Sequence, residues 1–398
     1  MTLLATRSAH RRRHAPRLAA FVLLLGAIAL ETIATSARAA APDWTIEITP
    51  DGELFPVLDL SQAPAESAAP GGGNGLVIVR VRGAEGPLRL VVETPGLEVP
   101  AVVETEIAAS GKPIELRPRL RWDTAWLRDL KAPRGQALRL TLESAGVARV
   151  REVAVRVHPL DDALYFVREG RERIDLGWVF AAYVNPDDPV VARVVDDARA
   201  IDPAFDTHGD DPETKLRKAR AIWAALTRHG LRYAAGDPAL SRGPAIYSQR
   251  VRLMSEVWNE RRANCLDGSV LLASVFERIG MPAFIALVPG HAFVGFRTGK
   301  GHAEFLETTL LGAGADSPRA AGTSAETDAN FDAALRAGRA RWRRTASRFD
   351  RRHAPDYALI DIGTARSYGI IPLGARGENV AGERAGPAAA LPRKSSSQ

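Results

Sequence analysis

The pattern of apolar and polar positions changes near residue 159. Between residues 43 and 158, short runs alternate apolar with polar residues, and Gly, Pro and Asn separate the runs. The runs read WTIEIT, NGLVIVRVRG, LRLVVET, PIELRPRLRW, ALRLTLES and VREVAVRVHP. Alternation with a period of two is typical of half-buried strands, so we expect an antiparallel β-sandwich domain with Ig-like topology over 43–158. No pattern here suggests a reaction, which favours a role in packing or partner contact.

From residue 159 to 240, apolar residues recur three and four positions apart, as they do on one face of a helix. The clearest example follows Asp211-Pro212 and ends before Gly230. Asp before Pro is a typical helix start, and Gly is a typical helix end. We therefore predict a helix over 212–229 that leads toward the most informative part of the chain.

Residues 263–310 predict one helix followed by three strands. The helix runs from about Cys265 to Ile279, with Asn264 as its cap and Asp267 returning the capping bond. The strand runs are FIALV at 284–288, HAFVGF at 291–296 and AEFLETT at 303–309. Pro-Gly and Thr-Gly-Lys-Gly turns separate these runs, so we expect consecutive hairpins.

The C-terminal part predicts a helix, a strand and a tail. NFDAALRAGRARWRRTASRFDRR, at 330–352, predicts a basic helix whose charge we interpret as a solvated face rather than a phosphate or nucleic-acid site. YALIDIGTARSYGIIPL predicts a final strand and its extension, and the composition of residues 374–398 predicts a disordered tail. The expected fold class is α+β: the sandwich domain, then a domain over 159–373 whose core helix packs on an antiparallel sheet.

The first 39 residues have the layout of a secretory signal peptide. A basic region precedes an uncharged apolar run from Leu18 to Leu30, and Ala37-Arg38-Ala39 offers small residues at the spacing of a cleavage site. The apolar run is short for a membrane span, which needs about 20 residues. An uncleaved anchor is the alternative and the only membrane contact expected. We expect an exported protein, periplasmic or secreted.

Net charge changes its meaning once residues 1–39 are set apart. They hold six Arg and one Glu, which is +5 of the formal net charge of +6, so the rest of the chain carries +1. A nearly neutral mature chain gives no reason to expect a nucleic-acid partner. The sequence also contains no metal-ligand spacing and no phosphate-binding loop, so no cofactor or metal is expected.

Cys265 is the only cysteine of the chain, although exported proteins usually carry cysteines in pairs. It cannot form an internal disulfide, so it is either an inert buried residue or a reactive thiol. The predicted helix start favours reactivity, because exposed N–H groups and the positive end of the helix dipole stabilise a thiolate. The same N–H groups can donate to a developing oxyanion.

His291 and Glu307 are the predicted partners of this thiol. Two of the eight histidines fall in the signal peptide, and five lie in polar or loop-like surroundings: His158, His208, His229, His302 and His353. His291 alone begins an apolar strand, where it is either a structural residue or the base that a thiol nucleophile needs. Neighbouring strands can bring Glu307 beside it to orient the imidazole, with Glu304 as a rival on the opposite face.

The stretch from about Lys215 to Thr309 resembles the transglutaminase-like superfamily. Its motifs IWAALTRHGLRY, NCLDGSVLLASVFERIGMPA, GHAFVGF and EFLETT follow the family's order of lead-in helix, cysteine, histidine and acid. The resemblance implies a papain-like fold with Cys265 as nucleophile, His291 as base and Glu307 as orienting acid.

Three residues are secondary candidates for this site. The family usually has Asp in a D-x-T setting where this chain has Glu307, so Asp361 in LIDIG is an alternative acid. Gln249 and Asn264 are candidates to support the oxyanion.

The favoured function is acyl transfer on peptide, protein or wall-derived amides in the cell envelope. Cys265 attacks the carbonyl carbon, His291 protonates the leaving amine, and water resolves the thioester. We expect hydrolysis rather than cross-linking, because cross-linking needs a dedicated amine-binding tunnel. The rival from another class is a non-catalytic envelope module that uses the papain-like core as a binding or assembly surface.

Overall fold

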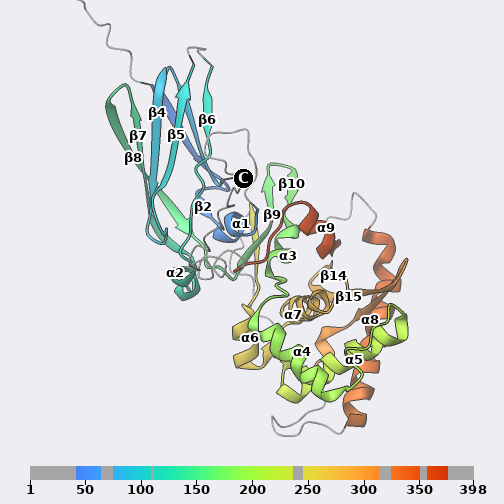
Figure 1. Ribbon diagram of the computed structural model, residues 1–398. Coiled ribbons are helices and arrows are strands. Elements are labelled where there is room, and N and C mark those ends of the chain that lie inside the picture. Colours follow the sequence, from blue (N-terminus) through green and yellow to red (C-terminus); the bar gives the residue numbers. More distant parts are fainter. Residues whose placement is uncertain are drawn as a thin grey trace, which may run out of the picture. The chain divides into compact units, whose positions relative to one another are not determined.

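The chain folds into a mixed α+β structure with several antiparallel sheets (Figure 1). The computed structural model describes residues 42–63, 75–108, 112–235, 245–312, 324–349 and 356–374. The expected signal peptide and the tail beyond Gly374 lie outside these residues. No helix in the described ranges is long and apolar enough to cross a bilayer.

The alternating runs of residues 43–158 form two sheets. Their strands are β1 (Asp43–Ile48), β2 (Glu53–Leu54), β3 (Val77–Arg82), β4 (Gly86–Glu93), β5 (Ala101–Ile107), β6 (Ile114–Leu116), β7 (Arg134–Ser144) and β8 (Val147–Val157). One sheet has the order β1-β3-β6 and the other β2-β8-β7-β4-β5, and only the β2–β8 pair is parallel. In β4, Leu88, Leu90 and Val92 are buried and the residues between them are not, which is the alternation that predicts a strand. Helices α1 (Pro56–Leu60) and α2 (Thr124–Asp129) interrupt the strands along the chain.

A further antiparallel sheet falls partly within the stretch predicted to be helical. It has the order β10-β9-β12 and consists of β9 (Asp162–Glu169), β10 (Glu172–Asp175) and β12 (Ile246–Arg250). Five of the first six residues of β9 are buried, so both faces of the strand are covered. A strand that is buried on both faces shows no alternation, which is why its sequence does not reveal it.

The described residues between β10 and Cys265 include the helices α3 (Phe180–Tyr183), α4 (Pro189–Ile201), α5 (Pro212–His229) and α6 (Met254–Glu260), and β12 lies between α5 and α6. The bounds of α5 confirm the prediction. The side chain of Asp211 accepts the N–H of Thr214 at 2.9 Å, and Gly230 adopts the left-handed conformation at φ +88° that ends the helix.

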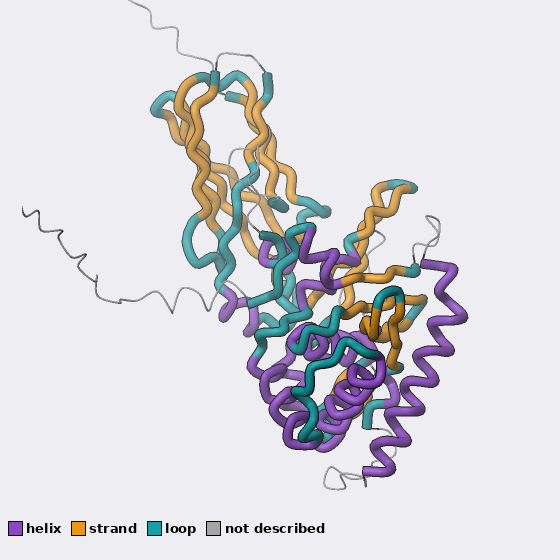
Figure 2. Tube along the Cα trace, turned by 45° about the vertical axis from the view of Figure 1, so that its right-hand side comes forward, coloured by secondary structure: helices purple, strands orange, loops and turns teal. Residues whose placement is uncertain are grey.

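The central sheet has the order β16-β15-β14-β17 and lies between two helices (Figures 1 and 2). Its strands are β14 (Ala283–Val288), β15 (His291–Gly299), β16 (His302–Leu306) and β17 (Ala358–Asp361), and the helices are α7 (Cys265–Arg278) and α8 (Ser324–Phe349). Phe296 of β15 packs on Phe276 of α7, whereas Phe305 of β16 stacks on Trp342 of α8 at 4.2 Å. Phe293 lies with Phe305 and Trp342, and because successive residues of a strand point to opposite faces, Phe293 and Phe296 lie on opposite faces of β15. Helices α7 and α8 therefore cover opposite faces of the sheet.

Two predicted elements differ from the structure near this sheet. The third predicted strand ends at Leu306, and Thr308–Leu310 form a 3₁₀ turn, η2, because the Glu307 side chain accepts the N–H of Thr309 and bends the chain. The predicted extension of the last strand is instead the helix α9 (Ile362–Ser367), which Asp361 caps by accepting the N–H of Thr364.

Candidate active site

Cys265 is the first residue of α7 and is half-buried. Oδ1 of Asn264 accepts the N–H groups of Leu266 and Asp267 at 2.8 and 2.9 Å. Oδ2 of Asp267 accepts the N–H of Asn264 at 3.1 Å, which completes the predicted capping box. Asn264 thus fixes the helix start on which the thiol is placed.

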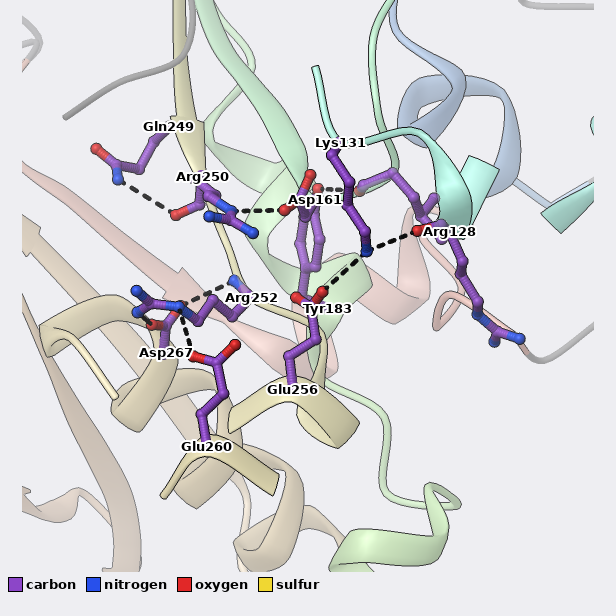
Figure 3. Close-up of polar contacts among 11 residues, drawn as sticks. Arg128, Lys131, Asp161, Tyr183, Gln249, Arg250, Arg252, Glu256, Glu260 and Asp267 are labelled. Atoms are coloured by element: carbon purple, nitrogen blue, oxygen red, sulfur yellow. Dashed lines mark hydrogen bonds and ion pairs between the residues drawn. The ribbon is translucent and has the colours of Figure 1, made fainter. Parts of the chain in front are cut away.

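Asp267 also ties the start of α7 to the segment before α6 (Figure 3). Its carboxylate accepts the backbone N–H of Arg252 at 2.9 Å and the Arg252 guanidinium at 3.0 Å. Asp267 is only 1% exposed, and burial raises its pKa despite the N–H groups of Asn264 and Arg252 and the charge of Arg252. This buried ion pair holds the helix that begins with Cys265 at a fixed position.

His291 and Glu307 lie side by side at one end of the central sheet. His291 begins β15, and Glu307 directly follows the last residue of β16. Nε2 of His291 lies 2.9 and 3.0 Å from the two carboxylate oxygens of Glu307. The side chains are 15% and 5% exposed, so solvent screens this pair only weakly.

The side chain of His291 also lies within interaction range of the Cys265 thiol, which acts to raise the pKa of His291. Since Nε2 is engaged by Glu307, Nδ1 is the ring nitrogen that remains for the thiol. Burial acts to lower the pKa of His291, but the side-chain interactions with Cys265 and Glu307 and their charges outweigh it and raise the pKa to about 9. The structure therefore favours an imidazolium beside the sulfur at neutral pH.

Two further groups fix the Glu307 carboxylate. The hydroxyl of Thr309 donates to Oε1 at 3.0 Å, and Nε of Arg341 donates to Oε2 at 2.8 Å. Burial acts to raise the pKa of Glu307, but the hydrogen bond and charge of His291 and the charge of Arg341 outweigh it, and the pKa is lowered. The acid is therefore ionised at neutral pH.

Arg341 is absent from the candidates that the sequence suggests. The basic helix was expected to be a solvated face, but Arg339 pairs with Glu304 and Arg341 pairs with Glu307. Part of the helix charge thus faces β16, which corrects that expectation. Trp342, which lies within this run of arginines, is the signal in the sequence that this face packs against something.

Tyr233 is a second residue that the sequence did not single out. It belongs to β11 (Arg232–Tyr233), which pairs in parallel with β13 (Arg262–Ala263), so that Tyr233 lies opposite Ala263. Burial and the charges of Cys265 and Glu307 raise the pKa of the Tyr233 phenol. The phenol therefore lies within electrostatic range of both residues.

The structure does not bring the remaining candidates to His291. Nε2 of Gln249 donates to the carbonyl of the next residue, Arg250, at 3.2 Å (Figure 3). Asp361 pairs with Phe284, at the far end of β14 from the partner of His291, and accepts from Arg297 at 2.9 Å. The carboxylate of Glu304 is held by Arg339. Glu307 is the acid that contacts the imidazole.

His158 lies in a buried rather than a loop-like setting. Its ring is 1% exposed, stacks on Phe55, and approaches Asp162 at 2.7 Å and Glu53 at 2.5 Å. Because solvent and substrate have no access to it, we interpret the cluster as a structural link between β2 and β9.

No family model and no curated protein matches this chain. Within the described ranges, no group of three or more His, Cys, Asp or Glu side chains is placed to hold a metal ion. The functional argument therefore depends on the motifs and on the geometry around Cys265.

Proposed function

We propose that the chain is an exported cysteine enzyme that cleaves peptide or protein amides through a thioester on Cys265. The observation that carries the proposal is the hydrogen-bonded pair of His291 and Glu307, placed within interaction range of the Cys265 thiol. Nucleophile, base and orienting acid come from a helix start and two neighbouring strands, in the order of roles that thiol catalysis requires.

The proposed reaction begins with a thiolate beside the His291 imidazolium. The sulfur attacks the substrate carbonyl, and the oxyanion is assigned to the backbone N–H of Cys265, because the N–H groups of Leu266 and Asp267 already donate to Asn264. Nδ1 of His291 gives its proton to the leaving amine, so a thioester and a neutral imidazole remain. The imidazole then takes a proton from water, whose oxygen attacks the thioester. The C–S bond breaks, the carboxylic acid product leaves, and the thiolate beside the imidazolium is restored. Glu307 holds the ring orientation throughout.

We extend the proposal to the fold and to its domains. The central antiparallel sheet, on which the helix that begins with Cys265 packs, supports a transglutaminase-like, papain-like domain over 159–373. The two sheets formed by residues 43–157 support an Ig-like sandwich that packs or contacts partners. Cleavage by water is favoured over transfer to an amine, because discharge by water is the default for a thioester in an aqueous compartment.

Alkylation of Cys265 by iodoacetamide near neutral pH tests the proposal. The reagent gives a single mass shift, because the chain has one cysteine. We expect rapid labelling of the native protein and a strong decrease in His291→Ala, because the imidazolium no longer stabilises the thiolate. Peptide amides, incubated with and without a primary amine, then distinguish hydrolysis from transfer.

The contrary result is also clear. Labelling that requires denaturant, at the same slow rate in His291→Ala, would identify Cys265 as a structural residue. The chain would then be the non-catalytic envelope module.

A further inference from the structure

We propose that Arg341 is a positioning residue of this site, which fixes the Glu307 carboxylate in the orientation that supports His291. The proposal rests on the function proposed above. It adds a residue from α8, a helix outside the stretch of the chain that carries the family resemblance.

The first argument is the geometry of the carboxylate. Each Glu307 oxygen faces Nε2 of His291. In addition, Oε1 accepts from the hydroxyl and the N–H of Thr309, and Oε2 accepts from Arg341. Glu has one more rotatable bond than the Asp usual in the family, so its carboxylate can leave the imidazole more easily. The Arg341 guanidinium restrains that freedom with a charge-assisted hydrogen bond.

The second argument is how firmly Arg341 itself is held. Trp342, the next residue, stacks on Phe305, two residues before Glu307. Gly338, one turn earlier in α8, lies so close to the Phe305 carbonyl that an added Cβ would be 2.1 Å from the oxygen. The Arg341 side chain is two-thirds covered, at 33% exposure. Its guanidinium is therefore placed by the packing of α8 on β16 and is not a mobile surface charge.

The chain supplies a matched control in Arg339. It also joins α8 to a β16 glutamate, Glu304, and its side chain has a similar exposure of 40%. Glu304 does not contact His291. Arg341→Gln and Arg339→Gln therefore each remove an ion pair between α8 and a glutamate in or next to β16. Only Arg341→Gln removes a partner of Glu307.

The experiment measures the iodoacetamide alkylation rate of Cys265 in the full mature chain in a double-mutant cycle. The variants are Arg341→Gln, Arg341→Lys, Arg339→Gln, Glu307→Gln and the double variant Arg341→Gln with Glu307→Gln. We expect Arg341→Gln to slow alkylation by about tenfold, because the Glu307 carboxylate loses a charge-assisted hydrogen bond that holds it against His291. Arg341→Lys should recover part of the rate, since it keeps a charged donor. In the Glu307→Gln background, Arg341→Gln should change the rate by less than about twofold, because Arg341 acts through the carboxylate.

Three outcomes would overturn the role of Arg341. The first is an alkylation rate in Arg341→Gln that equals the wild-type rate. The second is a decrease in Arg339→Gln as large as that in Arg341→Gln. The third is a decrease that Arg341→Gln causes equally in the Glu307→Gln background, which would indicate general destabilisation. If circular dichroism shows that Arg341→Gln is unfolded, Arg341→Lys and its combination with Glu307→Gln complete the same cycle. If wild-type Cys265 is alkylated no faster than the thiol of a free peptide, the proposed function and this role are both refuted. If wild type and Arg341→Gln are both alkylated rapidly, this role alone is refuted.

Discussion

The hydroxyl of Thr308 donates to the carbonyl oxygen of Cys265 at 3.1 Å, which joins the residue after Glu307 to the backbone at the start of α7. Thr308 is 2% exposed and belongs to η2, whereas Cys265 begins α7. The bond fixes the distance between the helix that carries the thiol and the strand end that carries Glu307. The relative positions of the Cys265 sulfur and the Glu307 carboxylate therefore depend on the Thr308 hydrogen bond, in which neither of these two groups takes part.

Thr308→Val removes this hydroxyl while nearly keeping the side-chain volume. We expect a loss of about 1 kcal/mol in the free energy of unfolding, typical of one hydrogen bond, and a lower alkylation rate of Cys265. The Cys265 carbonyl is not left unsatisfied, because Ser269 also donates to it at 2.6 Å. Urea unfolding and iodoacetamide kinetics measure the two effects. Thr308→Ser, which keeps the hydroxyl, should be close to wild type in alkylation; a slow Thr308→Ser would contradict the hydrogen-bond explanation.

Glu307→Gln tests the orienting acid. Glutamine fills the same space but carries no charge, so it cannot stabilise the imidazolium of His291. We expect the reactivity of Cys265 near neutral pH to fall by on the order of 100-fold, in line with the large effects of removing such a charge in catalytic triads.

Two control variants test the other acids that the sequence offers as partners of His291, namely Glu304 and Asp361. Glu304→Gln removes a glutamate of β16 that pairs with α8, and Asp361→Asn removes the alternative acid. Both variants should label at the wild-type rate. Slow labelling in Asp361→Asn would transfer the orienting role to Asp361.

The start of α7 and the strands around His291 could be predicted because their signals are local. Asn264 and Asp267 are three residues apart and cap each other, and Gly280 follows the helix end at a positive φ of 74°. Such short-range chemistry can be read without knowing the tertiary structure. The predicted pairing of His291 with Glu307 needed only one short hairpin.

The contacts of Arg341 and Arg252 could not be predicted in this way. Arg341 reaches Glu307 across 34 residues of sequence, and Arg252 reaches Asp267 across 15. Both depend on how separate elements pack, and an arginine in a charged run looks the same whether it is solvated or paired. The 3₁₀ turn after Glu307 was missed for a related reason, because the carboxylate that bends the chain there also occurs in ordinary strands.

The raised pKa of His291 predicts a specific dependence of stability on pH. Its folded value of about 9 exceeds the ordinary value of 6.5, so the folded state binds the proton more tightly than the unfolded chain. This contribution is fully present below pH 6.5 and is lost as the pH rises through about 9. The difference corresponds to at most about 3 kcal/mol. Urea unfolding across this window should show a clear decline for wild type and a flatter line for His291→Gln; equal slopes would show that the imidazole is not held as a cation.

Asp267→Ala should be among the most destabilising substitutions near the site. It removes the closer partner of a buried ion pair and leaves Arg252, whose side chain is 9% exposed, with the Glu260 carboxylate at 3.8 Å. Breaking such a pair typically costs about 3–5 kcal/mol. As a comparison, Asp361→Ala removes the cap of α9 and a partly exposed ion pair and should cost only about 1 kcal/mol. Thermal and urea unfolding measure both, and similar small losses would mean that Asp267 does not anchor α7.

Gly338→Ala tests whether the docking of α8 controls the site. An added Cβ would lie 2.1 Å from the Phe305 carbonyl oxygen and 2.4 Å from its carbon, and backbone cannot yield as a flexible side chain can. The helix must therefore shift away from β16, and overpacking of this kind costs about 1–3 kcal/mol. Since Arg341 moves with the helix, we expect Cys265 alkylation to slow as well.

Gly363→Ala in α9 is the matched control, because its Cβ would meet only the Asp361 carboxylate at 3.4 Å. It should be neutral or stabilise the chain by up to about 1 kcal/mol, as Gly-to-Ala changes in helices do. If Gly338→Ala labels as fast as Gly363→Ala while the loss in stability is confirmed, the packing of α8 matters for the fold but not for the thiol.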